Sequence, residues 1–188
     1  MSLYIKKHIR LSFKNLTEIT ECYRSLQIDY PKFFKMDGLS KLGFLASEMI
    51  FKDDKNRFEP NESIAVICFN RSSSLSIDTQ YQATIRNNEE YFPSPSLFVY
   101  TLPNIVTGEI SIRNKFLGET SFYICKEFDA KQMAEMVKNA FLDTTTTTVL
   151  AAWIEDFEGK NEVFMMLIEN EKGEMEFNET QLEQLYNI

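Results

Sequence analysis

The chain has 188 residues, a length that suits one domain. Hydrophobic residues make up 44% of it and Phe occurs 16 times, whereas Gly and Pro are scarce, so the composition is that of a globular chain and not of a disordered one. The net charge of −8 argues against nucleic acid as a partner, because an acidic surface repels a phosphate backbone.

The cysteine pattern predicts a reduced, cytoplasmic protein. Cys22, Cys68 and Cys125 are odd in number and far apart, and no C-x-x-C spacing occurs. No secretory signal is recognisable at the start of the sequence. No apolar run approaches the ~20 residues that a membrane-spanning helix needs, so we expect no membrane span.

The sequence contains a single histidine, His8. One imidazole excludes metal sites built from several His, and it excludes catalysis that needs a second imidazole. No glycine-rich phosphate loop or nucleotide fingerprint occurs either. We therefore expect no metal and no cofactor.

In the first half of the chain, hydrophobic periodicity predicts strands and helices in alternation. Ser63–Phe69 is a near-continuous apolar run, as in a strand that is buried on both faces of an α/β sheet. The other predicted elements are a strand over Leu3–Phe13, a helix over Asn15–Ile28, a helix within Lys32–Phe51 capped by Asp37 or Ser40, and a short helix over Thr79–Asn88.

In the second half, a strand over Ser121–Cys125 precedes a helix over Ala130–Leu142, for which Asp129 is a suitable N-cap. That helix is amphipathic, so we expect its polar face to lie at a surface. Two strands, Thr147–Asp156 and Val163–Glu169, form an antiparallel hairpin, and a small helix ends the chain over Asn178–Tyr186. The carboxylates Glu155, Asp156 and Glu158 are expected in a solvated turn.

The most specific stretch runs from Ser94 to Glu127, SPSLFVYTLPNIVTGEISIRNKFLGETSFYICKE. Pro103-Asn104 separates two apolar runs, and Thr107-Gly108 is expected to be a turn of small residues. Gly118 is expected to make a second turn that leads into the strand over Ser121–Cys125.

These segments resemble the N-terminal half of a β-ketoacyl synthase of the thiolase superfamily. The resemblance rests on Ser96–Gly108 and Ile110–Gly118, with weaker support from Leu3-Tyr4-Ile5, Phe33–Glu48, Ile64–Phe69 and Val163–Ile168. It is greatest to the divergent type associated with aryl-polyene and pigment pathways. It implies an α/β, thiolase-like half: one domain over residues 1–188, with a mixed, five-stranded sheet covered by helices, lacking the C-terminal half.

The resemblance also implies where a nucleophilic cysteine should stand, about nine residues after Gly118. Glu127 occupies that position, between Lys126 and Phe128, and Cys125 comes two residues too early. Small residues are needed there to place a sulfur at a helix N-terminus, which lowers its pKa. The family's catalytic histidines belong to the half that is missing. We expect no catalytic residues, with Cys125 as the one weak candidate.

The resemblance thus points to a non-catalytic accessory protein, similar to a chain length factor, in fatty-acid or polyketide-type synthesis. Its partner would be a ketosynthase or a second copy of itself in a dimer, with acyl carrier protein as a further possible partner despite the acidic charge. The expected contacts lie in Ser96–Gly108: Phe98, Tyr100, Leu102, Pro103, Asn104 and Ile105.

Two alternatives stay open. One is a scaffold or interaction domain with no acyl ligand. The other is a thioester hydrolase or acyltransferase that uses Cys125 with Glu127 or Asp129, which requires an accessible thiol of low pKa.

Overall fold

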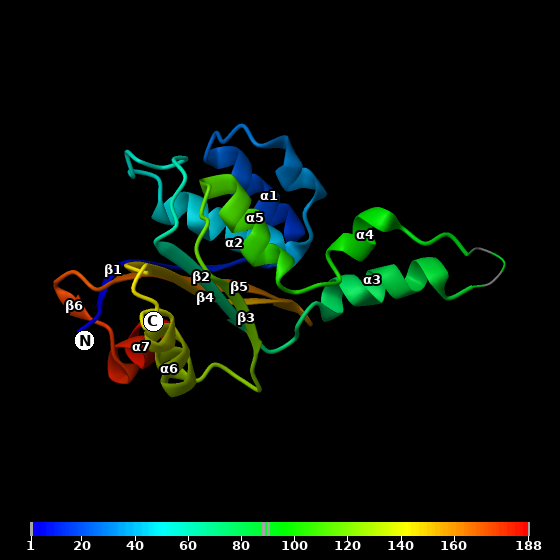
Figure 1. Ribbon diagram of the computed structural model, residues 1–188. Coiled ribbons are helices and arrows are strands. Elements are labelled where there is room, and N and C mark those ends of the chain that lie inside the picture. The colour runs from blue at the N-terminus through cyan, green and yellow to red at the C-terminus, as the bar shows by residue number, and fades with distance from the viewer. Residues whose placement is uncertain (1, 88, 90, 188) are drawn as a thin grey trace.

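A computed structural model describes residues 2–87, 89 and 91–187, and its centre is one mixed β-sheet (Figure 1). The strand order across the sheet is β3-β2-β4-β5-β1-β6. The five predicted strands are all present, and a strand of two residues, β6, is added at one edge. The strands are β1 (Tyr4–Ser12), β2 (Ile64–Asn70), β3 (Thr120–Ile124), β4 (Thr148–Phe157), β5 (Lys160–Glu169) and β6 (Met175–Glu176).

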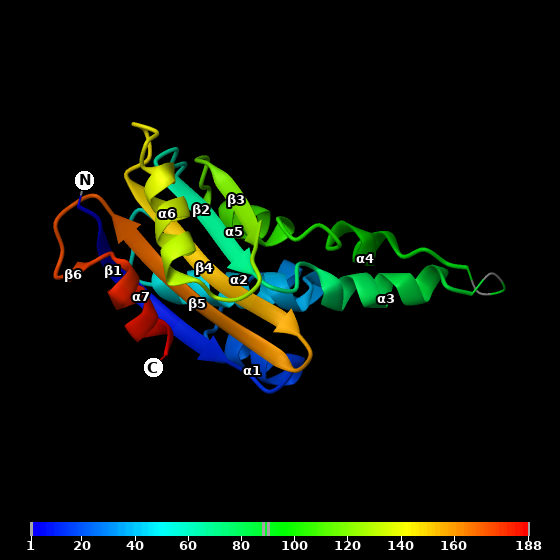
Figure 2. The same cartoon turned by 90° about the horizontal axis from the view of Figure 1, so that it is seen from below.

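Helices cover both faces of the sheet. α1, α2 and α5 lie on one face and α6 and α7 on the other, while α3 and α4 form an arm that extends beyond the sheet (Figures 1 and 2). The helices are α1 (Leu16–Ser25), α2 (Gly38–Ile50), α3 (Leu75–Ile85), α4 (Pro95–Val99), α5 (Ile105–Asn114), α6 (Ala130–Ala140) and α7 (Glu179–Tyr186), with a 3₁₀ turn over Pro31–Lys35 before α2.

The sheet has a parallel part and an antiparallel part. β2 pairs in parallel with both β3 and β4. The connection from β2 to β3 runs out through the arm of α3 and α4 and back through α5 on one face of the sheet, and the connection from β3 to β4 runs through α6 on the other face. β4 and β5 form the predicted antiparallel hairpin, and β1 pairs antiparallel with β5. The hairpin turn is Glu158-Gly159, and both residues have the positive φ that a tight hairpin turn requires.

β2 is buried along its whole length, as its apolar sequence predicts. Val66 and Cys68 face the core beneath α2 and α5, whereas Ala65, Ile67 and Phe69 face the core beneath α6 and α7. The helix caps are also as expected. Asp37 accepts a hydrogen bond from the Ser40 backbone N–H, and Asp129 accepts one from that of Gln132.

The outer face of α6 is exposed to solvent at Lys131, Glu135 and Lys138, while Met133 and Val137 are buried. The amphipathic pattern therefore describes the position of α6 correctly: one stripe packs on the sheet, and the charged stripe is left free by the described chain.

The expected turn at Thr107-Gly108 is wrong, because both residues lie inside α5. Val106 and Ile110 are one helical turn apart and pack in the core shared with α2. The helix ends instead at Lys115, which has a left-handed backbone with φ of 56°. The short helix expected over Thr79–Asn88 begins earlier, at Leu75, and Asn88 lies outside the described residues.

Candidate functional site

The segment after β3 is the place where the resemblance puts a nucleophile. Cys125 directly follows β3 and is half-buried; its backbone N–H donates to the Asn70 carbonyl oxygen at 2.8 Å. Its side chain packs against the core beneath α6. Burial, together with the negative charge of Asp129, raises the pKa of the Cys125 thiol above its ordinary value. The thiol is thus protonated at neutral pH, which is the opposite of what a nucleophilic cysteine needs.

Glu127, at the expected nucleophile position, is exposed beside a hollow of about 460 Å³ at the carboxyl ends of the parallel strands. The next residue, Phe128, stacks on Tyr186 with ring centroids 3.7 Å apart and meets Trp153 edge-on at 5.8 Å. The Arg10 guanidinium lies over the Tyr186 ring, 4.6 Å from its centroid. Aromatic side chains therefore fill the position where small residues would be needed for catalysis.

The carboxylates at the end of β4 do not form the solvated turn that the sequence predicts. Glu155 is buried and accepts hydrogen bonds from the backbone N–H groups of Arg71 (3.0 Å) and Ser72 (3.2 Å). It therefore holds the loop after β2 in place. Asp156 lies against the start of α2, where a Cβ on Gly38 would overlap its carboxylate. Burial and the nearby Asp37 charge raise the pKa of Asp156 to about 6. Glu158 alone is exposed.

β3 is an edge strand of the sheet, hydrogen-bonded on one side to β2. The Glu119 carbonyl oxygen accepts a hydrogen bond from the Val66 backbone N–H, and the Cys125 backbone N–H donates to the Asn70 carbonyl oxygen. The odd-numbered residues from 119 to 125 therefore direct their backbone groups toward β2. It follows that Thr120, Phe122 and Ile124 direct their backbone N–H and C=O groups away from β2. Within the described ranges no strand pairs with that outer edge.

Most of the residues expected to contact a partner lie in α4 and in the segment that joins it to α5. Phe98 and Leu102 are each 56% exposed, and Asn104 is exposed as well. Pro103 and Ile105 are half-buried, and Ile105 packs partly on the core.

Tyr100 differs from the other expected contacts, because it is a buried core residue of this chain. Its hydroxyl donates to Glu109 Oε1 at 3.2 Å, and Lys32 Nζ lies 2.7 Å from Glu109 Oε2. Burial and the Glu109 carboxylate raise the pKa of Tyr100. Tyr100 is therefore not available to a partner, and its role is structural.

Sequence reasoning missed further apolar residues at this edge. Ile112 is 65% exposed and Leu117 is 61% exposed, and both line a shallow groove with Gly108. A Cβ built on Gly108 would meet nothing within 4 Å. The spacing of Gly108 and Ile112 places them on one face of a helix, but the expected turn at Thr107-Gly108 hid that pattern. We call Phe98, Leu102, Ile112, Leu117 and Ile124 the β3-edge surface; α5 contacts β3 at the edge of the sheet, and α4 lies farther out, on the arm (Figure 2).

The fold is similar to that of solved ketosynthases. A chain of the ketosynthase (ApeO) in complex with its chain length factor (ApeC) from Xenorhabdus doucetiae aligns with a TM-score of 0.66 and 13% identity over 92% of this chain. The ishigamide ketosynthase/chain length factor aligns with a TM-score of 0.72 and 14% identity over 93%. This chain has the ketosynthase-like, thiolase-type fold. A type II polyketide synthase ketosynthase with its acyl-carrier protein is similar too, with a TM-score of 0.63 and 12% identity over 90%.

The ketosynthase-like fold is present here in a short form. The chain spans 81% of the length of the matched chain in the Xenorhabdus complex, but 64% and 62% of the lengths of the other two. No family model matches the sequence, and no curated protein matches it either.

The described residues also limit which other kinds of site the chain offers. They contain no group of three or more His, Cys, Asp or Glu side chains placed to hold a metal ion. In the same ranges, no helix is both long and apolar enough to cross a bilayer.

Proposed function

We propose that the chain is a non-catalytic accessory protein of chain-length-factor type, which pairs with a ketosynthase in fatty-acid or polyketide-type synthesis. The observation that carries this proposal is the unpaired outer edge of β3, flanked by the exposed apolar residues of the β3-edge surface. The names of the similar structures, which include ketosynthase and chain length factor complexes, support the choice of partner.

An open strand edge is a ready template for another strand. Its unpaired N–H and C=O groups favour addition of a partner strand, and proteins normally protect such edges with charges, bulges or covering segments. Here the residues whose backbone groups face outward are Thr120, Phe122 and Ile124, and none of them has a charged side chain. Apolar side chains on α4 and α5 extend the same side, so a partner would gain both backbone hydrogen bonds and buried apolar area.

The segment that follows β3 supports a role without chemistry. Condensation requires a nucleophile and groups that stabilise an enolate, and these must be held in position. Glu127 and the Phe128–Tyr186 stack occupy the relevant place, and the Cys125 thiol has a raised pKa. A hydrolase or acyltransferase built on Cys125 is disfavoured for the same reason.

Acyl carrier protein would reach such a complex through the ketosynthase partner. This chain carries a net charge of −8, which opposes direct contact with an acidic carrier protein. A homodimer through the same surface, and a scaffold with no acyl ligand, are the two competing arrangements.

The mass in solution distinguishes these arrangements. We would measure light scattering on the pure protein and on its mixtures with candidate ketosynthases from the same source. The proposal expects a stable mixed complex that Ile112→Asp weakens at least tenfold, because the substitution places a charge in the apolar interface.

The matched control is Leu16→Asp, which also charges an exposed apolar residue but lies on α1, toward the opposite edge of the sheet from β3. It should leave the complex intact. A monomer that ignores the ketosynthase would favour the scaffold alternative, and equal loss in both variants would remove the β3-edge surface from the interface.

A further inference from the structure

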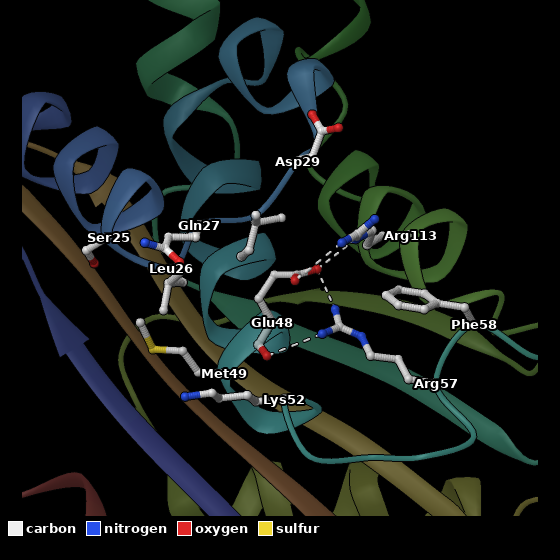
Figure 3. Close-up of a pocket in the computed structure, with 11 residues that line it drawn as sticks. Ser25, Leu26, Gln27, Asp29, Glu48, Met49, Lys52, Arg57, Phe58 and Arg113 are labelled. Carbon is white, nitrogen blue, oxygen red and sulfur yellow. Dashed lines mark hydrogen bonds and ion pairs between the residues drawn. The ribbon is translucent and has the colours of Figure 1, made fainter.

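A buried carboxylate on α2 is bound by two arginines. Glu48, on α2, forms ion pairs with Arg57 from the loop after α2 and with Arg113 from α5. Arg113 Nε donates to Glu48 Oε1 at 2.8 Å, and Arg57 Nε donates to Asn114 Oδ1 at 2.9 Å. Figure 3 shows the Glu48 carboxylate between the two guanidinium groups.

The cluster has more positive than negative charge. The side chains of Glu48, Arg57 and Arg113 are 4%, 9% and 19% exposed, so two cations and one anion share a largely desolvated place. One arginine would suffice to neutralise the carboxylate, and a second buried cation is costly unless an anion compensates it. Among the described residues, neither arginine forms an ion pair with any other carboxylate, although the charge of Asp54 also acts on Arg57. Asp29 and Lys52 lie on opposite sides of the hollow (Figure 3).

The guanidinium groups are held in fixed orientations. The Phe58 ring centroid lies 4.7 Å from the guanidinium carbon of Arg57 and 4.7 Å from that of Arg113. Tyr30 supports Arg113 from a further side at 4.8 Å. Such stacking leaves the in-plane N–H groups free to bind a planar oxyanion.

Arg113 retains unused donors that reach a hollow. Its hydrogen bonds within the described part of the chain all go to Glu48, through Nε and one terminal nitrogen, and the latter bond is long at 3.5 Å. The hollow beside it has a volume of about 610 Å³, within the size range of small-molecule sites. Its lining is mixed: charged side chains contribute part of it, and Leu26, Ile28 and Met49 supply apolar surface.

We propose that this hollow binds a small amphipathic anion, whose carboxylate or phosphate head pairs with Arg113 and whose short apolar body lies against Leu26, Ile28 and Met49. The head compensates the second arginine, and the apolar lining selects against fully hydrated inorganic ions. This site is separate from the β3-edge surface, so its occupation does not depend on a ketosynthase partner.

Nuclear magnetic resonance of the unmodified protein tests this directly. With the methionine methyl groups labelled and Met49 assigned through Met49→Leu, octanoate should shift the Met49 signal in a saturable way, at concentrations of about 1 mM or below. Octanamide, which has the same body without the charge, should bind at least tenfold more weakly. Octyl phosphate and inorganic phosphate then distinguish the two possible head groups and show how much the apolar body contributes.

A variant of Arg113 provides a second test of the proposal. Arg113→Met keeps an apolar stem against the aromatic rings and leaves Glu48 paired with Arg57, and it should weaken octanoate binding at least tenfold. The matched control is Arg71→Met, which removes an exposed arginine far from the hollow. If neither octanoate nor octyl phosphate moves the Met49 signal of the unmodified protein, the proposal is wrong; it is equally wrong if octanamide binds as tightly as octanoate.

Discussion

Phe128 and Tyr186 stack face to face, with their ring centroids 3.7 Å apart and their planes 4° from parallel. Phe128 follows Glu127, the position where the resemblance to β-ketoacyl synthases predicts a nucleophile, and Tyr186 is the last residue of α7. The stack therefore joins the segment after β3 to the C-terminal helix.

Removing the Tyr186 ring should destabilise the protein. We expect Tyr186→Ala to lower the free energy of unfolding by about 2 kcal/mol, because it removes both apolar contact and an aromatic pair. Tyr186→Phe keeps the ring and should change stability little. Urea unfolding measures both variants, and an alanine variant as stable as the parent would show that the stack contributes nothing.

The reactivity of Cys125 separates the accessory role from a Cys125-based enzyme. Burial and Asp129 raise its thiol pKa, so the pH dependence of iodoacetamide alkylation should have its midpoint above the ordinary cysteine value of 9.0. Mass spectrometry of the Cys125 peptide gives the rate at each pH, and the buried Cys68 serves as an unreactive reference in the same sample. A midpoint near neutral pH would revive the enzyme alternative.

Two helical glycines should respond in opposite directions to the same change. A Cβ on Gly43 would lie 2.5 Å from Val106 Cγ2 where α2 crosses α5, so Gly43→Ala should cost about 1–3 kcal/mol through overpacking. A Cβ on Gly108 meets open space, so Gly108→Ala should gain about 0.5–1 kcal/mol from helix propensity. Thermal unfolding of the pair tests both signs, and a loss of stability in Gly108→Ala would mean that α5 is packed differently.

Asp156 should make stability depend on pH. Its pKa is raised from 3.8 to about 6 in the folded protein. Between about pH 4 and pH 6, therefore, the Asp156 carboxyl is protonated in the folded state but ionised in the unfolded state. The contribution of the protonated Asp156 carboxyl to the free energy of unfolding is fully present below about pH 4 and is lost as the pH rises through about 6.

Asp156→Asn removes this loss. Relative to the parent, the variant should become more stable by ~1–2 kcal/mol between pH 4 and pH 7.5, after allowance for solvent screening. Urea midpoints at the two pH values measure the difference, with the exposed Asp53→Asn as the control. A difference between variant and parent that does not change with pH would contradict the assignment.

The strongly patterned elements could be predicted from the sequence. β2 has an unbroken apolar run because both of its faces are buried, and α6 alternates with helical period because one face is buried. Asp37 and Asp129 gave the starts of α2 and α6 correctly, since a side-chain cap is a local interaction that needs no knowledge of the rest of the fold.

Features that depend on contacts distant in sequence could not be predicted. Glu155 looks like a turn residue, but two backbone N–H groups from the loop after β2 satisfy it in the interior. Tyr100 looks like a surface aromatic until Glu109 supplies a buried partner. Gly108 suggested a turn, because sequence alone cannot show that the surrounding residues pack as a helix on α2.

The central claim is that the outer edge of β3 accepts a strand from a ketosynthase, and amide hydrogen exchange measures that edge itself. The backbone N–H groups of Thr120, Phe122 and Ile124 point away from β2, so they should exchange quickly in the isolated protein and slow down at least tenfold in the complex. The inward-bonded N–H of Cys125 should change little and serves as the internal reference. Exchange at these three amides that stays fast while light scattering shows a stable mixed complex would contradict the account.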